Sequence, residues 1–310
     1  MAKKSNIQRN WPKYLLQWGM LAAIVAGLLG LLPSIQNFNI EGLWPKETLE
    51  LKQILMGIAL LVVIVLFSKL FCGYLCPIGT VQDILIRLRN FLNIKSIKIV
   101  NGSIADKALR IFKYGLLFLI IYLATGPDDY NKHLYIWISI ASVGIIILGG
   151  FVIDMFWCRY ICPLGAIFNS LKFWTWVAAL VATWYAGNAL GAKIPWLYFP
   201  SIFCIIGYLV EIFDGETSMQ IIHVTKDEVP CNNCGVCVKM CPYHIDPRSF
   251  HNGKINHVDC TLCGECIASC HTGALNIGAS KPNKKRFWNL LPPILAIALV
   301  AFALWIGGII

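Results

Sequence analysis

Long runs of apolar positions alternate with short polar and basic segments along this chain. A helix rises about 1.5 Å per residue and the hydrocarbon core of a bilayer is about 30 Å thick. By that measure, we expect membrane-spanning helices at roughly residues 14–33, 52–71, 110–126, 134–157, 173–187, 195–213 and 288–310. The fifth and sixth runs are the weakest, because the fifth is short and prolines lie near the start of the sixth. A re-entrant pair of helices is an open alternative there.

The basic residues are distributed asymmetrically between the polar segments. Of the 26 Lys and Arg residues, 22 lie in the segments 1–13, 69–113, 159–172 and 211–286. Cytoplasmic flanks of membrane helices are enriched in Lys and Arg. The asymmetry therefore predicts a multi-pass protein with the N-terminus and residues 211–286 in the cytoplasm and the C-terminus outside.

Composition agrees with a membrane protein. The chain is 57% hydrophobic and 14% charged, whereas soluble domains carry about 25% charged residues. This excludes a disordered or fibrous protein and disfavours a soluble globule. The formal net charge of +10 follows from the basic cytoplasmic flanks, so we expect the lipid bilayer, and no nucleic acid, as a partner.

Eight of the thirteen cysteines form two runs with the same C-x2-C-x2-C-x3-C spacing. In this bacterial ferredoxin spacing, three thiolates bind one [4Fe–4S] cluster and the fourth cysteine binds the other cluster. Zinc prefers two separate CxxC pairs, and disulfides are rare in the reducing cytoplasm. The spacing therefore predicts two clusters, the first on Cys231, Cys234, Cys237 and Cys270 and the second on Cys260, Cys263, Cys266 and Cys241.

Four more cysteines form two pairs at the ends of apolar runs. Residues 72–79 (CGYLCPIG) and 158–165 (CRYICPLG) share the pattern C-x-Y-[LI]-C-P-[IL]-G, 86 residues apart. The i,i+4 spacing predicts that both sulfurs of a pair lie on one helix face, and the following Pro and Gly end the helix. Our leading hypothesis is a third redox or iron–sulfur site on Cys72, Cys76, Cys158 and Cys162. Two thiol/disulfide pairs, or cysteines used only for helix packing, are open alternatives.

Asp154 is an acidic residue at the predicted membrane depth, four residues before Cys158. Ionisable groups at that depth indicate function by default, so Asp154 is a candidate proton acceptor beside a quinol site. The structural alternative is a salt bridge between the two repeats, with Lys69, three residues before Cys72, as the partner of Asp154. Snorkelling of the charged side chain to the membrane interface is the other structural account. Cys204 has no partner at ligand spacing and is expected to be a small buried hydrophobe.

These patterns predict a mainly α, polytopic transmembrane helical protein with a small cytoplasmic α+β two-cluster ferredoxin-like domain. The expected domains are residues 1–213 (about six spans, carrying both CxxxCP repeats), 214–286 (the ferredoxin domain) and 287–310 (a C-terminal transmembrane helix). Walker, GxGxxG, Ser/His/Asp and CxxCH signatures are absent from the sequence. We therefore expect a protein that relays electrons, with no catalytic residue assigned and its status as an enzyme left open.

The motif combination resembles the NapH-type membrane polyferredoxins and their relatives in nitrous-oxide respiration and cytochrome-oxidase assembly. The resemblance covers roughly residues 52–165 and 225–275. It implies an electron-transfer subunit of a quinol dehydrogenase complex in the bacterial inner membrane. Quinone would be the substrate, and the partner would be a soluble ferredoxin-type donor or a reductase subunit. The alternatives are an assembly or metal-reducing factor for a respiratory enzyme and the electron-input subunit of an energy-coupling complex.

Overall fold

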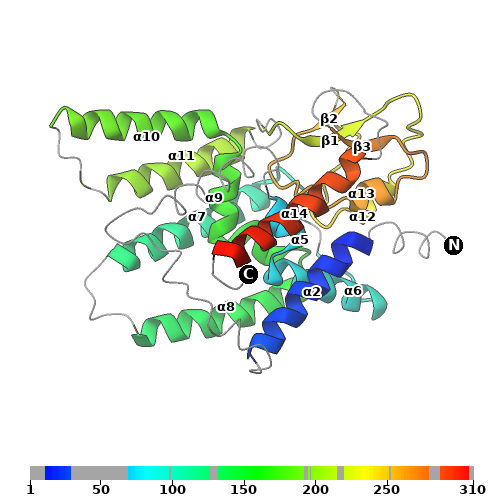
Figure 1. Cartoon of the computed structure of the whole chain (residues 1–310), viewed down its shortest axis with the longest axis horizontal. Coiled ribbons are helices and arrows are strands. Elements are labelled where there is room, and N and C mark those ends of the chain that lie inside the picture. The colour runs from blue at the N-terminus through cyan, green and yellow to red at the C-terminus, as the bar shows by residue number, and fades with distance from the viewer. Residues whose placement is uncertain are drawn as a thin grey trace.

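The protein is mainly helical, with one small sheet. The computed structural model describes residues 11–28, 69–97, 99–125, 132–191, 195, 197–214, 220–250, 253–278 and 287–306. Its elements are α2 (Trp11–Leu28), α5 (Leu70–Tyr74), α6 (Pro77–Phe91), α7 (Ile104–Thr125), α8 (Lys132–Val152), the π-helix η3 (Trp157–Ile161), α9 (Pro163–Leu171), α10 (Trp174–Ala189), α11 (Tyr198–Asp214), β1 (His223–Lys226), α12 (Val236–Met240), β2 (Lys254–Ile255), α13 (Glu265–Ala268), β3 (Leu275–Gly278) and α14 (Phe287–Ile306). The long helices α7, α8, α10 and α11 occupy one side of the molecule and the sheet lies at the other (Figure 1).

Six of the seven apolar runs form helices in the structure, and these helices are α2, α7, α8, α10, α11 and α14. The run at 52–71 lies almost wholly outside the described residues. Taken singly, no helix in the described part of the chain is both long and apolar enough to cross a membrane. Only α9 and α10, which are bent by 94° relative to each other, meet that criterion, and they do so as a pair. The membrane assignment therefore stays a prediction.

The expected continuous helix over residues 134–157 is wrong at its C-terminal end. Helix α8 ends at Val152, and Met155 adopts a left-handed φ of 51° before the chain enters η3. A residue in the left-handed region interrupts the helical hydrogen-bond ladder. Asp154 therefore lies in a turn, and it does not share a helix face with Cys158.

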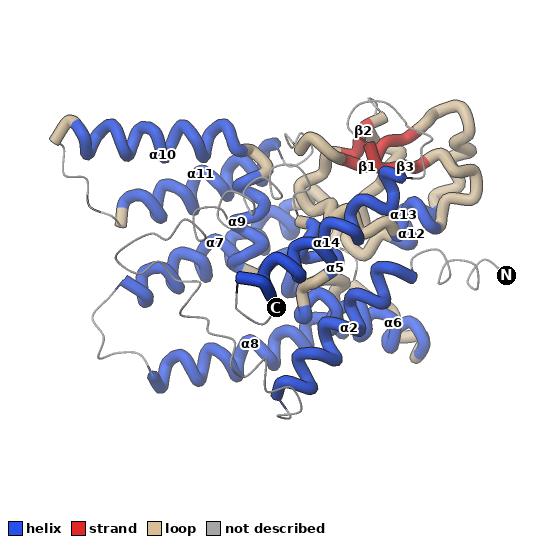
Figure 2. The backbone as a smooth tube through the Cα atoms, in the orientation of Figure 1, coloured by secondary structure: helices blue, strands red, loops and turns tan. Residues whose placement is uncertain are grey.

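The sheet is antiparallel, with β1 between β2 and β3. Val224 at its centre pairs with Ile255 on one side and Ile277 on the other, and all three are buried. Long loops flank these short strands (Figure 2). The sheet therefore provides a small apolar platform from which the two cysteine runs extend.

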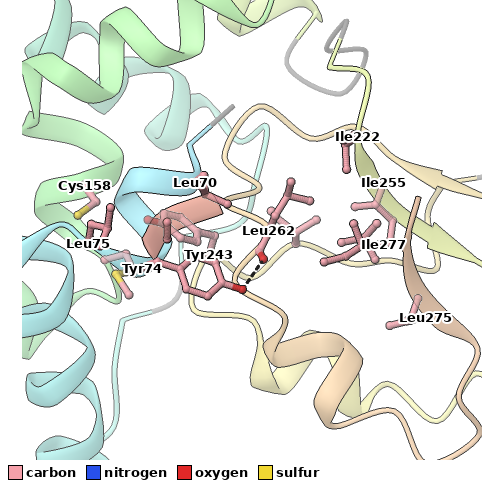
Figure 3. Packing of buried hydrophobic residues seen from close by; sticks show 14 of the residues in the cluster. Leu70, Tyr74, Leu75, Cys158, Ile222, Tyr243, Ile255, Leu262, Leu275 and Ile277 are labelled. Atoms are coloured by element: carbon pink, nitrogen blue, oxygen red, sulfur yellow. Dashed lines mark hydrogen bonds between the residues drawn. The ribbon is translucent and has the colours of Figure 1, made fainter. Parts of the chain in front are cut away.

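One apolar core runs from the sheet into the helices (Figure 3). Leu70 and Tyr74 of α5 belong to the same buried cluster as Leu262 and Ile277, and Ala296 of α14 joins it. Helix α14 also contacts α2, α5 and β3. The predicted ferredoxin segment 214–286 thus packs directly onto the helical part of the chain, which fixes the position of its cysteines relative to the CxxxCP motifs.

Candidate functional site

The two cysteine runs adopt the same backbone shape. Each turns through a left-handed residue just before its second cysteine, Asn233 and Leu262, both with φ of 54°. Each turns again just after that cysteine, at Gly235 (φ 72°) and Gly264 (φ 79°). These glycines cap α12 and α13, which carry the third cysteine of each run. A left-handed Leu262 is strained, and its side chain is 1% exposed, so packing holds the turn in place.

The four ligands predicted for the first cluster line one pocket, together with Gly235 and Arg248: these are Cys231, Cys234, Cys237 and Cys270. We call them the outer group, because Cys234 is exposed. Burial opposes ionisation of Cys270, but hydrogen bonds from Thr272 and from the Ala274 and Leu275 amides outweigh it and lower the pKa of this thiol. The outer group therefore has donors that stabilise a thiolate.

The four ligands predicted for the second cluster also lie together; we call Cys241, Cys260, Cys263 and Cys266 the inner group. Burial, together with the neighbouring Cys263 and Cys260, raises the pKa of Cys241 to about 12. Burial likewise raises the pKa of Cys266, with Cys263, Cys241 and Cys260 as the next causes. Cys241, the last cysteine of the first run, therefore lies with Cys260, Cys263 and Cys266, the first three cysteines of the second run.

Both groups fit iron–sulfur clusters by the chemistry of their donors. The four neighbouring thiols of the inner group all have raised pKa values, so they ionise together only when a cation compensates their charge, and iron does this. Backbone amides of Tyr243 and Ile245 already donate to the Cys241 sulfur. All thirteen cysteines are free of disulfide bonds. In the part of the chain that the structure describes, no three Cys, His, Asp or Glu side chains are grouped as ligands of a single metal ion.

The four CxxxCP cysteines meet at a third place. Cys72, Cys76, Cys158 and Cys162 line one pocket with Lys69, Ile78, Trp157, Gly165 and Tyr243; we call it the four-cysteine pocket. Burial raises the pKa of Cys72 to about 12, and its neighbours Cys76 and Cys162 add to the rise. The indole N–H of Trp157 is buried and has no acceptor in the described part of the chain. The structure thus brings together two motifs that are 86 residues apart in the sequence.

Backbone geometry explains the residues of the repeated motif. Cys76 (φ −66°, ψ 118°) and Cys162 (φ −62°, ψ 117°) are the N-cap residues of α6 and α9, each followed by proline at the first helical position. The expectation that both cysteines of a pair lie on one helix is therefore wrong. The helix breaks at the second cysteine, because an N-cap residue needs an extended backbone.

The glycine that ends each motif lies against the first cysteine. A Cβ at Gly79 would lie 2.8 Å from the Cys72 carbonyl oxygen, and one at Gly165 would lie 3.1 Å from that of Cys158. We expect Gly79→Ala to lower the free energy of unfolding by about 1–3 kcal/mol through overpacking, and Gly165→Ala to lower it by less. Thermal unfolding of the purified protein measures both.

Gly115→Ala in α7 is the matched control, since nothing lies within 4 Å of a Cβ at that position. Alanine is a better helix former than glycine by about 1 kcal/mol, so this variant should be at least as stable as wild type. Equal stability of Gly79→Ala and Gly115→Ala would contradict the close approach.

The inner group and the four-cysteine pocket are neighbours. Tyr243, two residues after Cys241, lines the pocket. The Tyr74 hydroxyl donates to the Leu262 carbonyl at 3.3 Å. A Cβ on Gly73 would lie 3.0 Å from the carbonyl oxygen of Thr261. Helix α5, which carries Cys72, therefore lies directly against the loop that carries Cys260 and Cys263.

Buried ion pairs hold this contact together. Asp259, which is 0% exposed, accepts from Lys69 at 3.1 Å and from Arg110 at 2.7 Å, and the Arg159 guanidinium lies 3.8 Å away. Burial opposes the ionisation of Asp259, but Arg110 and Lys69 outweigh it and hold its pKa well below the usual range. One carboxylate next to Cys260 thus ties three other segments of the chain to the loop that carries Cys260 and Cys263, which we call the inner loop.

Asp154 and Lys69 have different partners. Asp154 pairs with Arg89 and, at 2.8 Å, with His244. Lys69 pairs with Asp259, so the salt bridge between the repeats does not form between these two side chains. Cys204 is buried in a small cluster with Tyr114 and Leu117, apart from the three cysteine groups.

Sequence patterns did not mark Asp259, Tyr243 or Lys172 as parts of the site. Asp259 directly precedes a cysteine, and Tyr243 follows a Cys-Pro pair, but adjacency alone does not show which way a side chain points. The sequence does show that all three residues lie within ten residues of a motif cysteine, and this proximity could have marked them as candidates.

Comparison with known proteins agrees with iron–sulfur chemistry. The family described as "4Fe-4S binding domain" matches residues 54–95 and 135–175, which include all four cysteines of the four-cysteine pocket. No solved structure matches the chain.

Three relatives match over most of the chain at low identity. An uncharacterized protein of Methanocaldococcus jannaschii is 24% identical over 237 residues, which is 76% of this chain and 75% of the relative. YccM of Escherichia coli is 24% identical over 313 residues, 91% of this chain and 72% of the relative. The ferredoxin-type protein NapH of Haemophilus influenzae is 27% identical over 241 residues, 70% of this chain and 65% of the relative.

Proposed function

We propose that this chain is a NapH-like polyferredoxin, on the strength of its similarity to NapH and YccM and its match to an iron–sulfur binding family, and that it relays electrons between a redox partner protein and the quinone pool. The observation that carries the proposal is the succession of three groups of four cysteines in one folded body. Cys237 of the outer group and Cys241 of the inner group belong to the same run, so the two groups are neighbours. Tyr243, two residues after Cys241 of the inner group, lines the four-cysteine pocket, so these two groups are neighbours as well.

Each group supplies the donors of one iron–sulfur centre in this proposal. A [4Fe–4S] cluster, when bound, supplies one-electron redox chemistry at a potential tuned by hydrogen bonds and burial. Cys231, Cys234, Cys237 and Cys270 hold the first, and Cys260, Cys263, Cys266 and Cys241 hold the second. The pocket of Cys72, Cys76, Cys158 and Cys162 holds a third centre. Trp157 offers this pocket a buried N–H that has no acceptor among the residues that the structure describes.

The two ends of this series have different surroundings. Cys234 of the outer group is exposed, as contact with a soluble ferredoxin-type donor or a reductase subunit requires. The four-cysteine pocket lies at the start of α6 and α9 and at the ends of predicted membrane-spanning runs. Placement in the bacterial inner membrane, with the ferredoxin segment cytoplasmic, would bring this pocket to the depth where a quinone headgroup is reached.

The Asp154 carboxylate has a structural role in this proposal. Its pairing with Arg89 and His244 ties the turn after α8 to α6 and to the segment just after the first cysteine run. Asp154→Asn should therefore leave quinone-dependent oxidation of the clusters within about twofold of wild type, while lowering thermal stability by the loss of a buried pair. A loss of quinone reactivity at unchanged cluster content would show instead that Asp154 accepts the proton.

Redox titration of the full chain, purified in detergent, tests the proposed function. The protein is reduced with dithionite, the excess is removed, and duroquinone is added while the visible absorbance of the clusters is followed. We expect duroquinone to reoxidise the clusters. A Cys72→Ser/Cys158→Ser variant should keep the ferredoxin clusters but be reoxidised at least tenfold more slowly. The proposal fails if no quinone oxidises, and no quinol reduces, any cluster.

A further inference from the structure

Lys172 is a buried cation at the junction of the inner group and the four-cysteine pocket. It follows the C-terminus of α9, the helix that begins just after Cys162. Its ammonium donates to the carbonyl oxygens of His257 at 3.3 Å, Val258 at 2.6 Å and Cys260 at 3.0 Å. The side chain is 1% exposed. All three acceptors belong to the loop that leads into the inner group.

Lys172 differs from the other buried cations in having no carboxylate. Every other buried Lys or Arg of the described residues forms at least one salt bridge: Lys13, Lys69, Arg89, Arg110, Lys113 and Arg159. Within the same part of the chain, Lys172 forms none. Carbonyl dipoles solvate an ammonium but do not neutralise it, and a buried net charge is costly unless an anion compensates it. Burial and the nearby Lys69 accordingly lower the pKa of Lys172 to about 7, so a neighbouring anion is needed to hold the charged form.

An iron–sulfur cluster on the inner group would be that anion. Four thiolates outweigh the positive charge of the cluster core, and reduction adds one more negative charge. The Lys172 ammonium is bonded to the backbone of Cys260 itself. A positive charge favours the more negative, reduced state of a nearby group. Lys172 would therefore stabilise the reduced inner centre more than the oxidised one.

The outer group has no fully buried cation in its lining. Two cations line its pocket: Lys226, which is partly exposed, and Arg248, which is paired with Asp246 through two donors at 2.9 and 2.8 Å. The Arg248 and Asp246 side chains are more than a third exposed to solvent, where screening weakens any effect on a nearby centre. The two groups thus share ligand spacing and backbone shape but differ in electrostatic surroundings.

We propose that Lys172 is the counter-charge of the inner iron–sulfur centre and raises its reduction potential above that of the outer centre, so that electrons flow inward. The inference rests on the proposed function. A reduced ferredoxin-type donor gives one electron to the outer centre, which passes it to the inner centre and is itself reoxidised. Two such electrons, delivered one at a time through the four-cysteine pocket, would reduce one quinone to quinol with two protons taken up from solvent.

The test is a potentiometric titration of the full chain, with both clusters followed by electron paramagnetic resonance. A Cys241→Ser variant identifies the inner signal, which it should lack. Lys172→Met should disfavour reduction of the inner cluster about tenfold, which is about 59 mV for a one-electron couple. Lys172→Arg keeps the charge and should stay within threefold of wild type. Lys239→Met removes an exposed lysine beside the outer group and should shift neither cluster.

Four outcomes decide the matter. A shift confined to the inner cluster in Lys172→Met, with rescue by Lys172→Arg, supports the proposal. No shift, or an equal shift of both clusters, overturns it. If Lys172→Met does not fold, the wild-type order decides: an inner potential above the outer one supports the proposal, and the reverse overturns it. Wild-type protein without two clusters would contradict the proposed function instead.

Discussion

Cys241→Ser should remove the inner cluster, although Cys241 belongs to the first cysteine run. Its neighbours are Cys263, Cys260 and Cys266, while Cys270 lines the pocket of the first run in its place. The variant should lose about four irons per chain and keep the signal of the outer cluster. Because the inner group lies between the other two, reoxidation of the outer cluster by duroquinone should fall by at least a hundredfold.

Cys204→Ser is the matched control. Cys204 is also a buried cysteine, but it lies in α11 within an apolar cluster, and its replacement should leave the iron content unchanged. Iron analysis and paramagnetic resonance on both variants measure the difference. Loss of the same signal in Cys231→Ser as in Cys241→Ser would show that each run binds its own cluster.

Asp259→Asn should be the most destabilising single substitution outside the cysteines. The carboxylate is buried and shared by Lys69 and Arg110, with Arg159 close by. Breaking a buried pair by removing one partner costs about 3–5 kcal/mol, because the remaining charge is left uncompensated. We expect a loss of that size in the free energy of unfolding, measured by denaturant titration in detergent micelles.

The pH dependence of this stabilisation follows from the lowered pKa of Asp259. A carboxyl group whose pKa is depressed by folding contributes fully above its unfolded value of about 3.9, and the contribution is lost as the pH falls below that value. The difference between wild type and Asp259→Asn should therefore be constant near neutral pH and shrink only in acid.

Asp246→Asn provides the comparison for Asp259→Asn. Asp246 also pairs with an arginine, at 2.8 Å, but both side chains are more than a third exposed. Exposed pairs contribute about 0–1 kcal/mol, so this variant should unfold almost as wild type does. A similar loss in both variants would mean that the Asp259 cluster does not hold the inner loop to the helices.

Cysteine spacing could be read from the sequence because it is local. The two ferredoxin runs and the two CxxxCP motifs are short patterns, and their repetition indicated which cysteines belong together. The backbone at Cys76 and Cys162 was missed, since an i,i+4 spacing looks the same whether the helix continues or breaks between the two cysteines. The proline after each second cysteine marks the N-cap, because proline favours the first helical position.

The contacts that join the two halves could not be read from the sequence. Lys69 and Asp259 are 190 residues apart, and Lys172 is more than 80 residues from the carbonyls that it binds. Such pairs depend on how the ferredoxin segment is docked against α5 and α9, which no local pattern records. The sequence located the ligands of the proposed centres, and the structure was needed to see what surrounds them.

Iron and acid-labile sulfide, quantified per chain on the purified full-length protein, test the central claim most directly. Two ferredoxin clusters account for about eight irons, and a third centre in the four-cysteine pocket brings the total to about twelve if it is also a [4Fe–4S] cluster. The relay predicts clearly more than eight irons, with the excess lost in Cys72→Ser/Cys158→Ser. A value of about eight that the double variant leaves unchanged would contradict it.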